Sequence, residues 1–487
     1  MEPVFPFPLD LDCPRGMLSR TLHDQLRRAI VDGRLPADTP MPATRRAAAS
    51  LGVARNTVIV VYDLLIAEGF LIPHAGARPR VAALARNRGR STVTTQGLGR
   101  ARFAPVWRTP FLRPPPPRDL PERSFRLGVP DARHFPHATW RRLTARVLRR
   151  DARESFAYAP SEGIPALREA IAAHVAFTRA VACRAEDVIV TSGAQQAMDL
   201  IARLLVTPGE TRVAMEEPGY PPVRAAFAAA GARLVPVPVD AEGLCVDCLP
   251  ADVKIIGVTP SHQSPTGVFM SLRRRAALLE FARRHAAVVV EDDYDGEFRF
   301  GKHPLDALQM LDRDARVFYV GTFSKSLFPS LRKGFVVAPA WARDGLAMVK
   351  HCADSHCDST TQSVLAEFIG DGHLARHVRH MHRIYGARRG ALLDGLRDRL
   401  APWLEPIPSA AGMHLAARLR DPAQASRLLP VMLREAVGAE STADYAMVDN
   451  DNVEPAVVFG YGVADVDLIT DTLARLQQRL QSMQGVA

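Results

Sequence analysis

Apolar residues recur at helical spacing near the start of the chain. Leu22, Leu26 and Ile30 lie four residues apart, which predicts a first amphipathic helix. Two further helices are predicted, one over 44–51 and one from 55 to about 68, and a short glycine-containing turn joins them. Short helices linked by such a turn are typical of helix-turn-helix domains.

The last of these predicted helices has two different faces. Its apolar residues are expected to form the buried face: Val58, Tyr62, Leu65 and Ile66. Arg55, Asn56 and Thr57 stand at its exposed N-terminal end, the end that enters the major groove in a helix-turn-helix. The segment 69–81 predicts a two-stranded wing. The region 14–81 is therefore predicted to be a winged helix-turn-helix, with an ordinary small helical bundle as the alternative.

The pattern changes from about Leu127 onward. Apolar runs of strand length alternate there with helical patterns, which indicates an α/β domain over 127–487. A polar cluster follows each of four apolar runs, which span 188–190, 254–258, 288–290 and 317–320. Ligands of open α/β sheets bind outside the carboxyl ends of the strands, so the four clusters predict one shared site.

A segment of different composition separates the two regions. Residues 82–126 include four consecutive prolines and little periodicity, so we expect a basic, proline-rich and arginine-rich linker. The chain has a net charge of +10; residues 81–126 contribute +8 and residues 1–80 contribute +2. A basic excess suits a polyanion such as DNA, and a solvated arginine-rich linker is the plainer alternative.

Composition narrows the class of protein. The 487 residues are enough for two or three domains, and 47% of them are hydrophobic, which allows large cores. No run of about twenty apolar residues is present, so no membrane span is expected. Residues 1–12 are proline-rich and acidic, unlike a signal peptide, and six cysteines make no disulfide framework. These features predict a cytoplasmic protein.

The polar clusters contain the side chains that pyridoxal phosphate requires. This cofactor needs a lysine for a Schiff base, an acid facing its pyridine nitrogen, and donors for its phosphate. Lys325 follows a strand through small and hydroxyl residues, and burial would lower its pKa. Either Asp292 or Asp293 can supply the acid. Residues 193–195 open a helix, where free amides and the helix dipole attract a phosphate.

Three stretches resemble the winged DNA-binding domain of GntR-type regulators: LHDQLRRAIVDGRL, MPATRRAAASLGVARNTV and YDLLIAEGFL. The resemblance covers about 18–81 and implies that Arg45, Arg55 and Thr57 contact DNA. It departs from the family in the wing, because residues 74–81 replace a glycine-rich turn followed by Thr-Phe-Val. We therefore expect a wing tip of a different shape.

The second region resembles the aminotransferase-like domain of MocR-type regulators, in stretches such as VEDDYDGEFRF and VGTFSKSLFPSLRKGFVV. These are GntR-family members that carry a fold type I aminotransferase domain as an effector sensor. The resemblance implies that Lys325 forms the internal aldimine and that Asp292 pairs with the pyridine nitrogen. Tyr294 would bond the phenolic oxygen of the ring, and Tyr220 would stack on the ring.

The same resemblance implies a set of residues around the cofactor phosphate: Gly193, Ala194, Gln195, Thr322, Ser324 and Arg332. Tyr158 would reach the phosphate of a neighbouring subunit, which implies a head-to-tail, domain-swapped homodimer with shared sites.

Two departures concern the ligand. Ser264 stands where ordinary aminotransferases have an asparagine that bonds the ring oxygen, so a roomier pocket is expected. Residues 457–462 lack the arginine with which those enzymes grip a substrate carboxylate. The effector is therefore expected to lack an α-carboxylate held in the usual way, or to use another arginine such as Arg332.

The sequence contains cysteine and histidine motifs of residue types that can bind a metal. Cys245 and Cys248 have no second pair nearby, and the His-Cys pairs at 351–352 and 356–357 lie at helical spacing. The histidines and arginines of 373–383 are typical of a basic, solvated helix face. We assign no metal site to these motifs.

Three functions fit these observations. The first is a transcription regulator that binds operator DNA and senses an amino compound through an external aldimine at Lys325. The second is an active aminotransferase with an N-terminal appendage, although the missing asparagine and arginine argue against efficient turnover. The third is a regulator of vitamin B6 synthesis whose effector is pyridoxal phosphate itself. Effector identity, operator sequence and the sign of regulation do not follow from the sequence.

Overall fold

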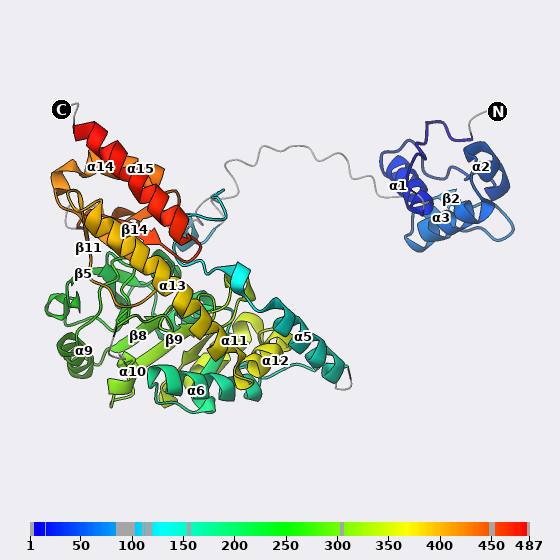
Figure 1. Cartoon of the computed structure of the whole chain (residues 1–487). Helices are drawn as coiled ribbons and strands as arrows, with labels where there is room; N and C mark the ends of the chain where they lie inside the picture. Colours follow the sequence, from blue (N-terminus) through cyan, green and yellow to red (C-terminus); the bar gives the residue numbers. More distant parts are fainter. Residues whose placement is uncertain are drawn as a thin grey trace. The chain divides into compact units, whose positions relative to one another are not determined.

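The computed structural model divides the chain into two compact units, Met1–Arg102 and Phe103–Ala487, drawn in Figure 1. It describes residues 4–14, 16–83, 103–109, 112, 119–152, 157–301, 306–447 and 453–484. Each unit is described below by itself.

The first unit contains three helices and a two-stranded hairpin: α1 (Leu18–Val31), α2 (Thr44–Leu51), α3 (Arg55–Ala67), β1 (Leu71–Ile72) and β2 (Arg80–Val81). The two strands pair antiparallel, and the axes of α2 and α3 are bent by 120° at their junction. Leu22, Leu26 and Ile30 lie in the core, as their spacing predicts. On α3, Val58, Tyr62 and Leu65 are buried and Ile66 is partly buried, so the predicted core face is confirmed.

A segment before the first helix adds to this core. Phe5 is buried among the helices, and Phe7 is partly buried beside it. The Arg34 guanidinium lies 4.9 Å from the Phe7 ring centroid, which is a cation–π distance. The N-terminal segment is thus part of the first unit.

An eight-stranded sheet forms the centre of the second unit. Its strand order is β3-β10-β9-β8-β7-β4-β5-β6. The bounds are β3 (Val188–Thr191), β10 (Gly334–Val337), β9 (Val317–Thr322), β8 (Val288–Asp293), β7 (Ile255–Val258), β4 (Arg212–Glu217), β5 (Arg233–Asp240) and β6 (Gly243–Leu244). The neighbours from β9 to β5 are parallel, whereas β10 and β6 run antiparallel to the strands they pair with. The four apolar runs that predicted strands are β3, β7, β8 and β9.

Helices cover both faces of this sheet because its strands are apolar on both sides. They are α5 (His137–Asp151), α6 (Pro165–Arg179), α7 (Ala194–Leu205), α8 (Pro221–Ala229), α9 (Leu272–Arg284), α10 (Leu308–Leu311), α11 (Arg343–Asp354) and α12 (Ser359–Gly370). On β3, Val188 and Val190 pack with α6 and α12, while Ile189 packs with α7 on the other face. This alternation gives a three-layer α/β/α arrangement.

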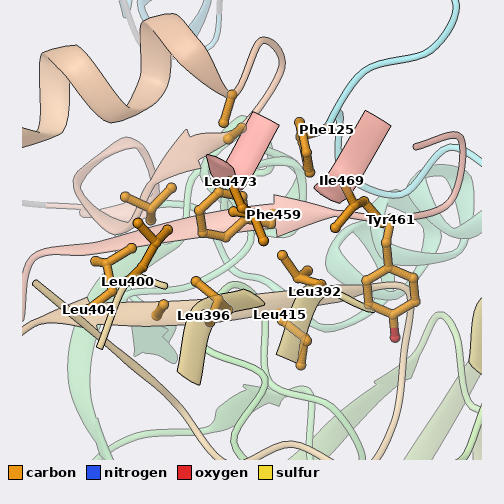
Figure 2. Packing of buried hydrophobic residues seen from close by; sticks show 14 of the residues in the cluster. Phe125, Leu392, Leu396, Leu400, Leu404, Leu415, Phe459, Tyr461, Ile469 and Leu473 are labelled. Atoms are coloured by element: carbon orange, nitrogen blue, oxygen red, sulfur yellow. The ribbon is translucent and has the colours of Figure 1, made fainter. Parts of the chain in front are cut away.

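A smaller antiparallel sheet lies in the C-terminal part, in the order β11-β12-β14-β13. Its strands and helices are β11 (Leu404–Pro406), β12 (His414–Leu419), β14 (Ala456–Gly460), β13 (Glu440–Ser441), α13 (His373–Asp398), α14 (Ala425–Glu435) and α15 (Val466–Gln484). Figure 2 shows its core, in which Leu415 and Phe459 of the sheet meet Leu396 and Leu473 of the helices.

Phe125, which falls in the predicted linker, belongs to this core. It is buried, and its ring meets that of Phe459 edge-on with the centroids 5.8 Å apart. Its amide donates to the Val437 carbonyl, and its carbonyl accepts from the Gly460 amide. The packed domain therefore begins at least two residues before the predicted boundary. Residues 84–102 of the predicted linker lie outside the described residues.

Within the described part of the chain, no single helix has the length and apolar content to cross a membrane, and the bent pair of α2 and α3 passes that test on length and composition only.

Candidate cofactor site and DNA-reading surface

Lys325 lies in the turn that follows β9. Its Nζ donates a hydrogen bond to the Gly128 carbonyl at 2.7 Å. A side chain at Gly128 would collide with the lysine, so this glycine makes room for the amine. Burial lowers the pKa of Lys325 below its usual value, while Asp295 and Asp292 oppose that shift. A lysine in these surroundings loses its proton more easily than one in water.

Asp292 lies at the end of β8 and is 5% exposed. Its Oδ1 has no hydrogen-bond partner among the described residues. Burial raises the pKa of Asp292 to about 7; Asp293 adds to this effect and Lys325 opposes it. A buried carboxylate oxygen without a partner is costly, so this atom is poised to meet a cationic or donating group of a ligand.

Asp293, the alternative acid, points to different partners because successive strand residues alternate in direction. The Arg179 guanidinium donates to its Oδ2, and the Tyr319 hydroxyl donates to the same oxygen at 2.7 Å. These bonds engage one oxygen of Asp293 in a buried ion pair on the other side of the strand, although its Oδ1, like that of Asp292, has no partner among the described residues. The geometry therefore favours Asp292 as the acid of the site.

The end of β3 and the end of β9 meet beside β10. A Cβ at Gly334 would lie 2.8 Å from the Gly193 carbonyl carbon and 2.9 Å from the Gly321 oxygen, so the three backbones touch. Gly193 caps α7 with φ +82°, a conformation that favours glycine, and a Cβ there would lie 2.8 Å from an Arg332 guanidinium nitrogen.

This junction gathers the predicted phosphate-binding groups. Arg332 donates to the Ser192 carbonyl at 2.7 Å, next to the first turn of α7. Thr322 donates to the Ser324 hydroxyl at 3.0 Å. Gln195 instead donates to the Pro222 carbonyl at 3.0 Å. A helix N-terminus beside an arginine and two hydroxyls is suited to a phosphate.

Tyr220, Thr259 and Asp292 line one pocket together. Tyr220 is 41% exposed as a whole residue, but desolvation raises the pKa of its hydroxyl to about 12, and Asp292 adds to the rise. Thr259 donates its amide and hydroxyl to the buried carboxylate of Glu216, at 3.2 and 2.5 Å. Glu216 was not singled out from the sequence: it lies near the end of β4, in the same stretch as Tyr220, where only the tyrosine was given a role.

Tyr294 and Ser264 bond to protein atoms near the pocket. The Tyr294 hydroxyl donates to the His262 carbonyl at 2.9 Å. The Ser264 amide donates to the Thr259 hydroxyl at 3.2 Å, and Ser264 is buried. The roles of both residues toward a cofactor ring stay predictions.

A second group of residues was missed by sequence reasoning. Among the described residues, His262, Asp295 and His414 form a buried group whose metal-capable atoms all lie within 4.8 Å of one another. His262 stands in the polar cluster predicted after the run 254–258, but the sequence assigned it no role. His414 is more than a hundred residues away, so only the folded chain brings these side chains together.

Tyr158 is separate from this site within one chain. Its side chain is 91% exposed, and its ring contacts His356 with centroids 5.8 Å apart. Its predicted contact with a neighbouring subunit is not tested by a single chain.

The predicted DNA-contacting residues lie at the N-terminal ends of α2 and α3. Arg45, Arg55 and Asn56 are exposed, and Thr57 is partly buried. Arg55 donates through Nε to the Thr44 hydroxyl at 3.3 Å, which links the first turn of α3 to that of α2. A helix end with exposed arginine and asparagine is suited to bonds with base edges and phosphates.

The second unit fits pyridoxal phosphate on the geometry of its own residues. An unpartnered buried carboxylate oxygen on Asp292, an amine on Lys325 and a glycine-capped helix beside Arg332 are the three kinds of group that this cofactor needs. When bound, the cofactor would supply an aldehyde carbon that captures a primary amine.

Comparison with known families gives two matches. Residues 18–81 match the profile of bacterial regulatory proteins of the gntR family. Residues 125–443 match the profile of class I and II aminotransferases. The two matches fall in the two units in the order predicted.

Individual relatives are similar to most of the chain. The chain is 41% identical, over 84% of its length and 82% of the relative, to a probable rhizopine catabolism regulatory protein MocR of Rhizobium meliloti. It is 31% identical, over 93% of its length and 94% of the relative, to the pyridoxine biosynthesis transcriptional regulator PdxR of Corynebacterium glutamicum. The fold is similar to that of a kynurenine aminotransferase from Pyrococcus horikoshii, with a TM-score of 0.68, 27% identity, and coverage of 75% of this chain and 92% of that one.

Proposed function

The chain belongs to the GntR family of bacterial transcription regulators, in the MocR-type branch that joins a winged helix-turn-helix to an aminotransferase-like domain, and from this premise we propose that it is a pyridoxal-phosphate-dependent sensor of an amino compound. In this proposal the second unit holds the cofactor on Lys325, and the first unit binds a specific operator.

One observation carries the cofactor assignment. Asp292 Oδ1 is buried without a partner, and Lys325 is near enough to lower the pKa of the same carboxyl. A pyridinium nitrogen would give that oxygen a charged donor, and the cofactor carbonyl carbon would take the Lys325 amine. A buried carboxylate oxygen without a hydrogen-bond partner is costly, and such a ligand would supply the missing partner.

Sensing follows from exchange at Lys325. An incoming primary amine would take the place of Lys325 on the cofactor carbon, and Lys325 would be released as a free amine. The Gly128 carbonyl is in place to accept a hydrogen bond from the released lysine, at the 2.7 Å separation present here. Burial favours the neutral lysine that this exchange needs.

Regulation requires that the amine binds one arrangement of the protein more tightly than another. The operator would be read by the exposed ends of α2 and α3, with Arg55 and Asn56 toward base edges and Arg45 toward the backbone. We propose a homodimer as the working form, on the resemblance that places Tyr158 at the cofactor phosphate of a neighbouring subunit; the 91% exposure of Tyr158 is compatible with that contact.

The cofactor assignment is tested by visible absorption. Full-length protein is mixed with pyridoxal phosphate, and the wild type is compared with Lys325→Ala and with Lys254→Ala, which removes an exposed lysine away from the site. The wild type and the control variant should both develop the band of a lysine-bound cofactor, and Lys325→Ala should not. A band of equal intensity in Lys325→Ala would contradict the assignment.

An active aminotransferase is the second candidate, because Lys325 and Asp292 lie where such chemistry needs them. It predicts steady release of a keto acid from an amino-acid donor in the presence of an acceptor. Single-turnover release alone would favour the sensor. A change in DNA binding with the cofactor alone would instead identify pyridoxal phosphate as the effector.

A further inference from the structure

Three buried side chains lie together next to the segment that the Lys325 amine contacts: Asp295, His262 and His414. The Lys325 amine donates to the Gly128 carbonyl, and a Cβ at Gly462 would collide with the next carbonyl, that of Val129, and lie 2.8 Å from Met413 Cε. The Met413 amide in turn donates to Asp295 Oδ2 at 3.2 Å. His262 Nδ1 lies 2.9 Å from Asp295 Oδ2, and the two imidazole rings have centroids 4.3 Å apart. The group is therefore close enough to Lys325 to meet the substituents of an amine bound there.

Hydrogen bonding fixes which nitrogen of each imidazole carries the proton. A carbonyl oxygen only accepts, so His414 Nε2, 3.0 Å from the Pro265 carbonyl, is the donor and Nδ1 keeps its lone pair. A carboxylate also only accepts, so His262 Nδ1 donates to Asp295 and Nε2 keeps its lone pair. The Tyr294 hydroxyl donates to the His262 carbonyl at 2.9 Å, and its oxygen lies 3.1 Å from His262 Nδ1, so Tyr294 contacts the protonated nitrogen and leaves Nε2 free.

The free nitrogen of His262 is buried and has no partner among the described residues. The residue itself is 2% exposed. Two glycines hold its ring: a side chain at Gly412, where φ is +84°, would overlap the imidazole, and a Cβ at Gly267 would lie 3.2 Å from Nε2. The ring is thus fixed by close packing, with an acceptor atom that the protein leaves unused.

The acceptor atoms of this group oppose a carboxylate. It presents two acceptor nitrogens and the carboxylate of Asp295, and a second carboxylate would add only acceptors. Of the nearby arginines of α13, Arg388 donates to Asp131 and to the Gly462 carbonyl. Arg389 donates through Nη2 to the Ser409 carbonyl, and its Nε has no partner among the described residues. Strand β14, where aminotransferases are expected to place a carboxylate-binding arginine, has the sequence AVVFG.

We infer that the amine sensed at Lys325 carries hydrogen-bond donors, either hydroxyl or a second ammonium, where an amino acid has its carboxylate, and that His262 and His414 accept those donors. This inference rests on the proposed function, because the amine must first be bound at Lys325. It names the chemical class of the effector: an amino alcohol or a diamine rather than an amino acid.

Four amines of equal chain length test it on the full chain loaded with pyridoxal phosphate: 3-amino-1-propanol, 1,3-diaminopropane, propylamine and β-alanine. The change in the cofactor's absorption against amine concentration gives an apparent dissociation constant for each. At least one of the two donor-bearing amines should bind at least tenfold more tightly than propylamine, and β-alanine should bind most weakly. The alcohol and the diamine together show which donor is preferred.

The variants His262→Phe and His414→Phe keep a ring and remove the lone pairs. Each should reduce the ratio of affinities between the preferred donor-bearing amine and propylamine at least fivefold, whereas His285→Phe, a control on the far end of α9, should keep it. Two variants are used so that a loading defect in one leaves the other informative.

Several outcomes would overturn the inference while leaving the proposed function intact. One is β-alanine binding as tightly as the alcohol or the diamine, with Arg389→Gln removing that affinity. Another is an unchanged ratio in both histidine variants. A third is stoichiometric Zn²⁺ binding that both histidine variants abolish, which would assign the lone pairs to a metal. If no amine changes the spectrum of loaded protein, the proposed function fails as well.

Discussion

Arg55 is the first residue of helix α3, and Lys325 follows strand β9. The two side chains differ in how far they are exposed to solvent. Arg55 is exposed at the first residue of α3, and its contact within the first unit is a single bond to Thr44. Lys325 lies three residues past β9 among buried acids, with a lowered pKa. The first unit presents exposed charges to a partner, whereas the second lowers or raises the pKa of its site residues by burying them.

This difference predicts that substitutions in the DNA-reading surface of the first unit affect function without affecting stability. Substitutions in the cofactor site of the second unit should affect both. DNA reaches only exposed side chains, so substitutions at the reading end of α3 should change binding and leave folding alone. The cofactor site consists of buried acids, ion pairs and close glycines. Substitutions there should change stability and ligand binding together.

The largest effect is expected at the buried pair of Arg388 and Asp131. The Arg388 guanidinium donates to Asp131 Oδ2 at 2.6 Å and to the Gly462 carbonyl, and both side chains are at most 5% exposed. Arg388→Leu leaves a buried carboxylate without this partner and should destabilise the second unit by about 3–5 kcal/mol in chemical denaturation.

The matched control uses the other arginine of the same carboxylate. Arg133 donates to Asp131 Oδ2 at 2.7 Å, but its side chain is 41% exposed. Arg133→Ala should cost less than about 1 kcal/mol. Equal losses in the two variants would show that burial does not distinguish these pairs.

The next largest effect is a pH-dependent change in stability that comes from Asp292. Burial raises its pKa to about 7, so the folded, cofactor-free protein holds a proton that the unfolded chain loses near its ordinary pKa of about 3.9. Stability should therefore fall as pH rises through this window. Asp292→Asn cannot titrate and should lack that part of the fall, up to about 4 kcal/mol at about 1.4 kcal/mol per pKa unit.

The comparison of wild type and Asp292→Asn isolates this carboxyl, because Glu216 and Glu291, whose pKa values burial also raises to about 7, titrate in both proteins. Denaturant melts in the absence of cofactor at about pH 4 and about pH 8 measure it. A parallel pH dependence in the two proteins would mean that Asp292 ionises in the folded chain as it does in water.

Arg55→Ala tests the prediction that an exposed residue of the first unit affects DNA binding without affecting stability. Loss of a base contact should weaken binding to a DNA sequence selected from a random pool by about 1–3 kcal/mol, measured by fluorescence anisotropy at fixed salt. The melting of the first unit should shift by less than about 0.5 kcal/mol. Leu65→Ala, ten residues further along the same helix and fully buried, should instead cost about 2–5 kcal/mol of stability.

The smallest effect is expected at Thr44. Thr44→Val removes the hydroxyl that accepts from Arg55 Nε and should weaken DNA binding by about 0.5–1 kcal/mol. In a double-mutant cycle the substitution should have no further effect once Arg55 is alanine. Additive losses would show that Thr44 contacts DNA by itself and does not orient Arg55.

The sequence predicted the elements that depend on local pattern. Leu22, Leu26 and Ile30 repeat at helical spacing, and the apolar run 288–290 predicted a strand, which the structure extends to Asp293 as β8. Local pattern did not separate Asp292 from Asp293, because the choice depends on which side of the strand Arg179 occupies. It also placed Phe125 in a linker, since one aromatic residue after a proline run shows no periodicity.

The group of His262, Asp295 and His414 shows even more clearly that local sequence pattern does not predict contacts made by the folded chain. Its members come from the loop after β7, the loop after β8 and the start of β12, and each stands alone in its own segment. Their meeting depends on the packing of the small sheet against the large one. No spacing rule in the sequence connects them.

The central claim is that an amine bound at Lys325 changes the affinity of the protein for DNA. The most direct measurement is the anisotropy-derived affinity for the selected DNA, with the full chain loaded with pyridoxal phosphate, before and after adding an amine that alters the cofactor spectrum. The account predicts a change of about 5- to 150-fold in the wild type, the usual range of allosteric coupling, and none in Lys325→Ala. An equal response in Lys325→Ala, or no response in a wild type whose spectrum does change, would contradict it.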